Sequence, residues 1–210
     1  MRGKPDHQRT LRGTVAAPPI DLASGTVRQV VQGECLVTAD PELTYSTVLG
    51  SCVAACVRDV DARVGGVNHF LLAGPGRMRA DGPASARYGD VAMAELIAMV
   101  LAQGTGRRAA LEIKLFGGGS VHEALADIGA QNIACARQFL FREGFAIAGE
   151  DLGGAVARRI LYHPASGRVF VRRLRADASD RLAHREIAEA GRVRADDGHG
   201  TGTMGTRGTR

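Results

Sequence analysis

Tryptophan is absent from this chain of 210 residues, and aromatic residues make up only 4% of it. The core must therefore be built from valine, leucine, isoleucine and alanine. Apolar residues at 45% and charged residues at 23% fall in the ordinary globular range. The length suits one domain with a substantial core.

Cysteine is also scarce, with Cys35, Cys52, Cys56 and Cys135 as its four occurrences. They are too few and too scattered for a disulfide scaffold. The N-terminal sequence lacks the apolar segment of a secretory signal, and no run approaches the roughly 18 apolar residues of a membrane span. We therefore expect a cytoplasmic protein without membrane insertion, where a cysteine is a core residue, a ligand or a nucleophile.

The net charge of +5 comes mainly from arginine. Such a charge suits an acidic or nucleic-acid partner. The sequence has no basic helix, no arginine-aromatic interleaving and no zinc-finger spacing, so no nucleic-acid partner is expected. An arginine-rich, lysine-poor composition explains the charge more simply.

Composition divides the chain into three parts. Residues 1–25 are rich in proline, glycine and charge without periodicity, which predicts a flexible leader. Residues 178–210 combine weak helical character with a low-complexity Gly/Thr/Arg tail that cannot bury a core. The folded domain is therefore expected over residues 26–177.

Helix and strand patterns are interspersed within this domain. The clearest helix is expected over residues 89–104, with Gly104 as its C-cap, and a second over about 131–143, with Gln131 and Asn132 as capping residues. The predicted strands are 27–37, 52–57, 67–72 and 111–116, and a hairpin spans 157–174. Because hairpins argue against a doubly wound parallel sheet, the predicted fold class is α+β.

The stretch TVLGSCVAACVRDVDARVGGVNHF, residues 47–70, holds a cysteine and a histidine that strand geometry relates. If it forms a hairpin with a two-residue loop, Cys52 lies opposite His69, with Cβ atoms about 4.5–5.5 Å apart. A loop longer by two residues moves Cys52 opposite Leu71 and leaves His69 on the diagonal. Both registers put the thiol and the imidazole on one face of the sheet.

Neighbouring residues favour chemistry over simple packing for this pair. Gly50 and Ser51 place Cys52 at the mouth of a turn, where free N–H groups can face a reacting carbonyl. The preceding STVLGS segment supplies hydroxyls able to orient an imidazole. Asn68 and His69 are polar residues in an apolar strand, which needs a reason to carry them.

Simpler interpretations apply to the other candidate sites. On an extended strand Cys52 and Cys56 stand roughly 13 Å apart, too far for one tetrahedral zinc ion, so no metal site is expected. Cys56 and the remaining cysteines are expected in the core. The GGGS segment, residues 117–120, lacks the lysine of a P-loop and predicts a tight strand-to-helix turn beside the cleft.

Five stretches of the domain share their order and spacing with a known family. They are LGSCVAACVRD, GGVNHFLLAG, LFGGGSV, DIGAQNIACARQFL and EDLGGAVARRILYHPASGRVFVRRL, preceded by GEC at residues 33–35. Together they resemble the CheD family of chemoreceptor glutamine deamidases over about residues 26–174. The resemblance implies a compact single-domain β-sandwich-like core flanked by helices, similar to the catalytic domain of Rho-deamidating toxins.

The resemblance also implies an enzyme, a protein-glutamine deamidase that converts glutamines of methyl-accepting chemotaxis receptors to glutamates and needs no cofactor. The nucleophile carries over to Cys52 and the base to His69. The third, hydroxyl-bearing member carries over to Ser46, where the family usually has threonine, and neighbouring Thr47 is the alternative. The supporting residues are Gly50 and Ser51 at the oxyanion and Thr47, Asn68 and Gly118 in the cleft.

Two other functions stay open. One is a non-catalytic module that docks on receptor helices or on a CheC-like phosphatase, roles that coexist with catalysis in the family. The other is a receptor methylesterase, because the same thioester path cleaves a glutamyl methyl ester.

Overall fold

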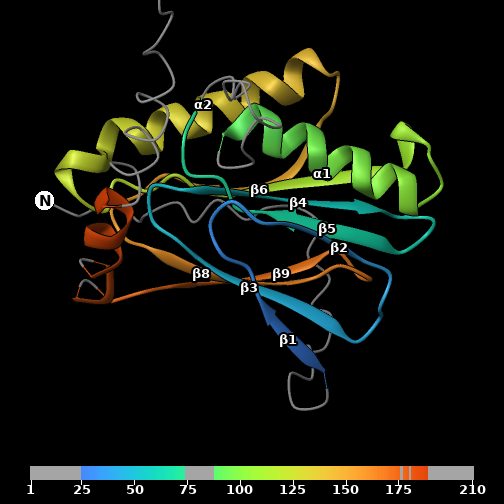
Figure 1. Ribbon diagram of the computed structural model, residues 1–210, viewed down its shortest axis with the longest axis horizontal. Helices are drawn as coiled ribbons and strands as arrows, with labels where there is room; N and C mark the ends of the chain where they lie inside the picture. The colour runs from blue at the N-terminus through green and yellow to red at the C-terminus, as the bar shows by residue number, and fades with distance from the viewer. Residues whose placement is uncertain (1–24, 74–87, 176, 180, 189–210) are drawn as a thin grey trace, which may run out of the picture.

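The computed structural model describes residues 25–73, 88–175, 177–179 and 181–188. Two β-sheets lie face to face, and helices α1 (Gly89–Gln103) and α2 (Ala126–Arg142) cover the outer side of one of them (Figure 1). The fold is therefore mixed α+β, as predicted. The likeness to Rho-deamidating toxins stays a prediction.

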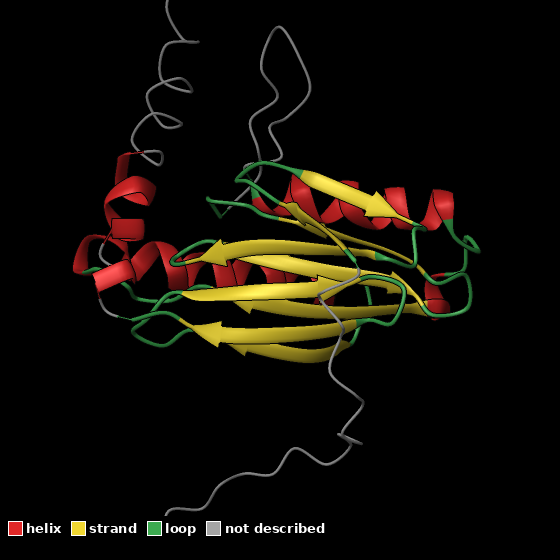
Figure 2. Ribbon diagram, turned by 90° about the horizontal axis from the view of Figure 1, so that it is seen from below, coloured by secondary structure: helices red, strands yellow, loops and turns green. Residues whose placement is uncertain are grey.

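Each sheet combines strands from both halves of the chain. Figure 2 shows the molecule from below, with strands in front of the helices. The first sheet has the order β1-β3-β8-β9, with β1 (Thr26–Gln29), β3 (Leu43–Leu49), β8 (Arg158–His163) and β9 (Arg168–Arg173). The second has the order β2-β5-β4-β6-β7, with β2 (Cys35–Thr38), β5 (Val64–Asn68), β4 (Val53–Asp59), β6 (Leu111–Gly117) and β7 (Ile147–Leu152). The short 3-10 helices are η1 (Arg108–Ala110) and η2 (Glu123–Leu125).

Strand β4 and the residue before it contribute to both apolar layers. The even-numbered residues 52–56 pack against the first sheet beside Tyr45 and Ile160. The odd-numbered residues 53–57 pack against α1 and α2. Because successive side chains of a strand point to opposite faces, a strand covered on both sides is apolar throughout.

Both helices were predicted, α1 at both of its ends and α2 only at its C-terminal end. Helix α1 ends at its predicted C-cap, Gly104. Helix α2 begins at Ala126 rather than near residue 131. The sequence did not reveal its first turn, because that turn contains Gly129, a poor helix former. A Cβ atom at Gly129 would lie 2.8 Å from the carbonyl oxygen of Gly118, so close backbone packing requires the glycine.

The strand predictions were incomplete. The predicted strand 27–37 is two strands, β1 and β2, which belong to different sheets and are separated by the loop 30–34. Strand β3 was not predicted, because its sequence LTYSTVL carries buried hydroxyl groups where apolar residues are expected. Strand β7, IAGEDL, was also missed. It lies at the edge of its sheet and contains a glycine and two acidic residues, which are uncommon in strands.

The folded domain extends beyond the predicted boundary at Asp177. Residues 177–179 and 181–188, here called the C-terminal segment, are helical and pack on the domain. Ala183 and Glu186 in this segment are fully buried. The sequence predicted weak helical character here. The apolar strip of this helix is too short to indicate that the segment packs on the domain. The predicted leader and the tail beyond residue 188 lie outside the described residues.

Among the helices that the structure describes, none is long and apolar enough to cross a membrane.

Candidate active site

Strands β4 and β5 form the predicted hairpin in the longer-loop register. Val53 bridges Phe70, which places Cys52 opposite Leu71 and His69 on the diagonal. Diagonal side chains lie about 7–8 Å apart at their Cα atoms and are still within reach when one is long. The thiol and the imidazole therefore share the inner face of the second sheet.

The turn at residues 60–63 sets this register. Asp59 stands opposite Val64, and its carboxylate accepts hydrogen bonds from the N–H groups of Asp61 (3.1 Å) and Ala62 (3.0 Å). Arg63 takes the left-handed conformation, with φ of 57°. An aspartate that bonds the backbone two residues ahead favours a turn of this kind, so the longer loop replaces the two-residue one.

The His69 ring is fixed by a hydroxyl group from the opposite sheet. Thr47 Oγ1 lies 2.9 Å from His69 Nδ1 and donates a hydrogen bond of 2.8 Å to the carbonyl oxygen of Val30. Since the single hydroxyl proton is directed to Val30, the threonine oxygen accepts the Nδ1 proton of a neutral imidazole. Nε2 is then the unprotonated nitrogen, and it has no hydrogen-bond partner among the described residues.

Of the two hydroxyl candidates, Thr47 and not Ser46 contacts His69. Both residues are buried in β3, but neighbouring side chains of a strand point to opposite faces. The Ser46 hydroxyl accordingly has no hydrogen-bond partner in the part of the chain that the structure describes. The geometry therefore favours the alternative residue over the one that the family resemblance indicated.

Burial lowers the pKa of His69 to about 4, although the Val30 carbonyl raises it slightly. The charged imidazolium loses its hydration in the interior, which disfavours protonation. His69 is therefore a neutral base at neutral pH.

This low pKa predicts that folding stability depends on pH. Between pH 6.5 and about 4 the unfolded chain binds a proton on His69 that the folded protein does not, so stability falls as the pH falls. We expect this one group to remove roughly 3 kcal/mol across that window, from its shift to about 4. Denaturant unfolding of the unmodified chain and of His69→Gln at several pH values measures the effect. Parallel pH profiles for the two proteins would contradict it.

The Cys52 thiol is completely buried. Its pKa lies well above the ordinary value, first because of burial and then because of the charge and hydrogen bonding of the Glu186 carboxylate. A hydrogen bond of 3.2 Å from Gln32 Nε2 to the sulfur acts in the opposite direction. In this conformation the sulfur is a protonated thiol, and Gln32 is the group placed to stabilise the thiolate.

The turn before Cys52 presents hydrogen-bond donors, but they are not free, because a carboxylate accepts their hydrogen bonds. The N–H groups of Gly50 and Ser51 donate to the two oxygens of Glu186 at 3.1 and 2.8 Å. The Ser51 hydroxyl donates to the same carboxylate at 2.7 Å. These three donors form an anion-binding site beside the thiol.

The GGGS segment supports this turn through its backbone. The N–H of Gly118 donates to the carbonyl oxygen of Cys52, and that of Gly119 to Gly50, both at 2.7 Å. A Cβ atom at Gly117 would collide with the Cys52 carbonyl oxygen, so only glycine allows this approach. The segment is a strand-to-helix turn, as predicted, and these bonded N–H groups are not available to a phosphate.

Asn132 joins the ends of the two hairpin strands. Its Nδ2 donates to the carbonyl oxygens of Ser51 (3.0 Å) and Leu71 (2.9 Å). The predicted capping role is wrong, because Asn132 lies inside α2 rather than at its start. The residue instead holds the segments that carry Cys52 and His69 in register.

Replacing Asn132 with aspartate is expected to destabilise the protein by about 3 kcal/mol or more, because a buried carboxylate would face two carbonyl oxygens. Gln131→Glu is the matched control, since Gln131 is an exposed neighbour on the same helix. Denaturant unfolding at neutral pH compares the two variants. Equal midpoints would show that the amide does not hold the strands.

Comparison with known sequences assigns the family. The family model described as CheD chemotactic sensory transduction matches residues 71–173. The probable chemoreceptor glutamine deamidase CheD of Caulobacter vibrioides (strain NA1000 / CB15N) is 51% identical over 148 residues, which cover 70% of this chain and 78% of that protein. This chain belongs to the CheD family.

Other relatives agree with this assignment. Proteins with the same name from Rhizobium meliloti (strain 1021) and Hydrogenovibrio crunogenus (strain DSM 25203 / XCL-2) are 49% and 45% identical over 146 and 172 residues. The alignments cover 70% and 80% of this chain, and 79% and 88% of those proteins. The crystal structure of Bacillus licheniformis hypothetical protein YfiH aligns with 58% of this chain and 49% of its own, at 14% identity and a TM-score of 0.36, too low to relate the folds.

Asn68, expected in the cleft of a CheD protein, lies on the other side of the sheet. Its Oδ1 accepts from the N–H of Ala55 at 2.8 Å, and its Nδ2 donates to the carbonyl oxygen of Ala92 in α1 at 2.9 Å. Strand alternation explains the correction, because consecutive residues cannot both face Cys52. Gly118, by contrast, does lie against the Cys52 backbone.

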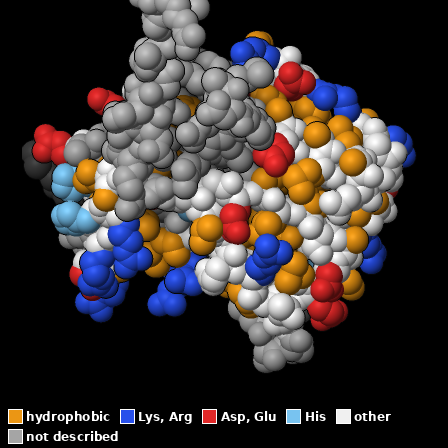
Figure 3. Space-filling model, viewed as in Figure 1, with side chains coloured by type: hydrophobic (Ala, Val, Ile, Leu, Met, Phe, Trp, Pro, Cys, Tyr) orange, Lys and Arg blue, Asp and Glu red, His pale blue; other side chains and the backbone are white. Residues whose placement is uncertain are grey.

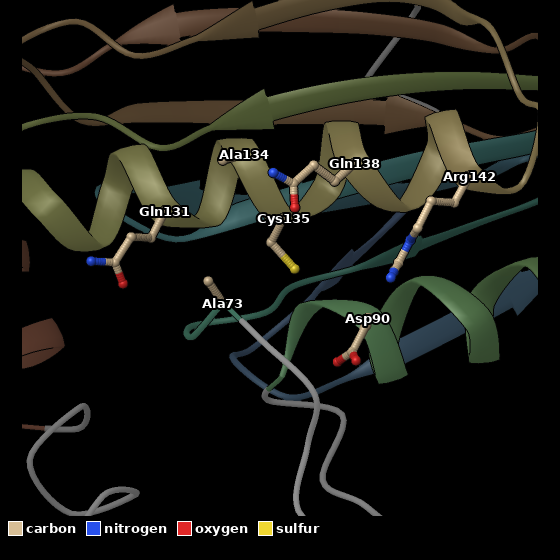
Figure 4. A pocket seen from close by; sticks show the side chains of 7 residues that line it. All are labelled: Ala73, Asp90, Gln131, Ala134, Cys135, Gln138 and Arg142. Carbon is tan, nitrogen blue, oxygen red and sulfur yellow. The ribbon is translucent and has the colours of Figure 1, made fainter.

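None of the other three cysteines of this CheD-family chain forms a disulfide within the described residues. Cys56 is buried between the sheets. Burial, with a smaller effect of Glu95, raises the pKa of Cys35 to about 12. Cys135 lines a cavity of about 470 Å³ beside α1 and α2 (Figure 4). The other residues that line this cavity are Ala73, Asp90, Gln131, Ala134, Gln138 and Arg142.

Proposed function

We propose that this protein is a chemoreceptor glutamine deamidase with Cys52 as nucleophile and His69 as base. The relatives carry that activity in their names. The observation that supports it in this chain is the imidazole held by Thr47, with an unprotonated Nε2 on the face that carries the thiol. A thiol and a neutral base that share one face of a site are the pair of groups that cysteine hydrolases use.

The reaction proceeds in two steps. His69 Nε2 accepts the Cys52 proton, and the thiolate attacks the carboxamide carbon of a receptor glutamine. The tetrahedral intermediate expels ammonia, which takes its proton from His69, and leaves a thioester. Water, deprotonated by His69, then hydrolyses the thioester to glutamate and restores the thiol.

Donors next to the thiol stabilise the oxyanion of each step. The N–H groups of Gly50 and Ser51 and the Ser51 hydroxyl are already oriented toward negatively charged oxygen atoms. Donors fixed in advance stabilise developing charge without reorganisation. Gln32 adds a donor to the sulfur itself, a contribution that the sequence did not reveal.

One end of the molecule carries several basic side chains. Basic side chains gather at the lower left of the face in Figure 3, where the β8–β9 hairpin and the C-terminal segment lie in Figure 1. Arg172, Arg173, Arg175 and Arg181 line a shallow pocket there, together with Asp177, which forms ion pairs with Arg175 and Arg181. A basic surface of this kind steers an acidic protein partner. A cytoplasmic location and a CheC-like partner stay predictions.

Thr47→Val is expected to lower the deamidation rate about 10-fold to 100-fold, because His69 loses the acceptor that holds its tautomer. Thr47→Ser keeps the hydroxyl and is expected to restore most of the activity. Ser46→Ala is the matched control, because its hydroxyl does not contact His69. The deamidation rates of the three variants, measured across pH, show which hydroxyl group supports His69. A larger loss for Ser46→Ala than for Thr47→Val would assign the third member to Ser46.

Incubation of the full chain with cytoplasmic fragments of chemoreceptors, followed by peptide mapping, tests the proposed function. Conversion of specific glutamines to glutamates is the expected result. The same receptor peptide as a glutamine amide and as a glutamyl methyl ester separates a deamidase from a methylesterase. Binding without conversion of either form would indicate an adaptor.

A further inference from the structure

Glu186 is a buried carboxylate with no basic partner among the residues that the structure describes. It is fully buried, and no ion pair to it occurs within the described part of the chain. Glutamate is almost never fully buried unless it is paired. Here its charge is compensated by the N–H groups of Gly50 and Ser51 and by the Ser51 hydroxyl.

These donors are the ones assigned to the oxyanion in the reaction. The charge of the carboxylate that they bind also raises the pKa of the Cys52 thiol. A cysteine deamidase converts a glutamine side chain at this position into a glutamate side chain. Glu186 is therefore chemically identical to the product and occupies the place where the product carboxylate forms.

From this coincidence we propose that the C-terminal segment is an internal product analogue, whose Glu186 occupies the substrate side-chain site and keeps the enzyme closed. The inference rests on the proposed deamidase function. A receptor helix that presents a glutamine must displace Glu186 before Cys52 can attack. The self-inhibition is thus a competition between two side chains of the same shape, one attached to the enzyme and one to the substrate.

The state of the thiol agrees with a closed site. Cys52 has no exposed surface, so no protein substrate reaches it in this conformation. The nearby carboxylate also raises the pKa of the thiol, since a thiolate beside a second negative charge is disfavoured. Removal of Glu186 would therefore have two effects: the sulfur would become accessible, and its ionisation would be favoured.

The packing of the C-terminal segment is limited enough to allow its displacement. Its apolar contacts involve one small aliphatic cluster, to which the segment contributes the buried Ala183 and the partly buried Leu182 and Ile187. Ser179 Oγ adds one hydrogen bond of 3.1 Å, which it accepts from the Ala157 N–H. Segments with few buried apolar contacts open at low free-energy cost compared with the global fold.

Alkylation of Cys52 by iodoacetamide tests the closure without any substrate. Glu186→Ala is expected to raise its labelling rate about tenfold or more, because apparent reactivity follows the fraction of open molecules. Arg185→Ala, at an exposed neighbour in the same segment, is expected to leave it unchanged. Labelling of the buried Cys56, followed in the same peptide map, serves as an internal control for general unfolding. Equal Cys52 labelling in the unmodified chain and in Glu186→Ala would overturn the proposal.

Glu186→Gln tests the product analogy more sharply, because it places a carboxamide beside the thiol. Cys52 Sγ is expected to form a thioester with the introduced glutamine side chain as ammonia leaves, and water then hydrolyses it to glutamate. Mass spectrometry should show glutamate at position 186 in purified Glu186→Gln and an intact amide in Glu186→Gln/Cys52→Ala. An amide that persists in both proteins would overturn the proposal.

Receptor fragments separate this inference from the proposed function. If the unmodified chain deamidates a fragment while the amide introduced at position 186 persists and Glu186→Ala labels like the unmodified chain, the deamidase stands and the self-inhibition fails. If neither the fragment nor the introduced amide is converted, the proposed function itself fails. If the deamidase function and the self-inhibition are both correct, Glu186→Ala should convert the fragment faster than Arg185→Ala.

Discussion

Replacing Cys52 with alanine is expected to abolish conversion of receptor glutamines, with a loss of about 10⁴-fold or more in kcat. The thioester requires a sulfur nucleophile, and no other cysteine shares the face and the turn that Cys52 occupies. The small, buried site accepts alanine without steric conflict, so the fold should be retained. The rate of glutamine-to-glutamate conversion in a receptor fragment measures the effect.

Cys56→Ala is the matched control for this variant. Cys56 lies four residues further along, on the same face and also buried between the sheets. Its loss is expected to leave the specific rate of folded protein unchanged. Residual activity in Cys52→Ala that equals that of Cys56→Ala would exclude Cys52 as the nucleophile.

Replacing His69 with glutamine is expected to lower kcat by about 10²-fold to 10⁴-fold, the range that general acid–base catalysis supplies. Glutamine retains polar atoms near Thr47 but cannot shuttle a proton. The loss has two parts, because the thiol is no longer deprotonated and the departing ammonia is no longer protonated. Initial rates with one receptor fragment measure it.

The pH profile of His69→Gln separates catalysis from folding. Raising the pH ionises a thiol without help from a base, so part of the lost activity should return in alkaline solution. A variant that was merely unfolded would not recover. Unchanged activity at neutral pH would remove His69 from the mechanism.

The Cys–His pair could be found from the sequence because strand parity does not depend on loop length. Cys52 and His69 share a face in both registers that the hairpin allows. The register itself depended on Asp59, whose side chain bonds the turn. Local patterns also identified α1, the C-terminal end of α2 and the β8–β9 hairpin, whose signals lie within single segments.

Contacts between distant segments could not be predicted in this way. Thr47 was one of two hydroxyl candidates, and the choice between them depends on how the two sheets face each other. Gln32 was not a candidate, because it reaches the sulfur from a loop between two strands of different sheets. Asn132 was assigned to a helix end because Gly129 concealed the first turn of α2. Glu186 lies in a segment whose weak apolar pattern suggested no packing. Each depends on tertiary contacts that short-range periodicity does not encode.

In the proposed closed site, the groups that serve catalysis also regulate it. The donors that would stabilise the oxyanion already bind a carboxylate from the chain itself. An enzyme of this design would stay inactive until a helix with a suitable glutamine competes for those donors. Such a competition links activity to the presence of the substrate, without a separate regulatory site.

The most direct test of the central claim is the peptide map of one chemoreceptor cytoplasmic fragment after incubation with the unmodified chain and, in parallel, with Cys52→Ala. We predict that specific glutamines become glutamates in the first sample and remain glutamines in the second. Conversion at the same sites and rates in both samples would contradict a Cys52 thioester mechanism.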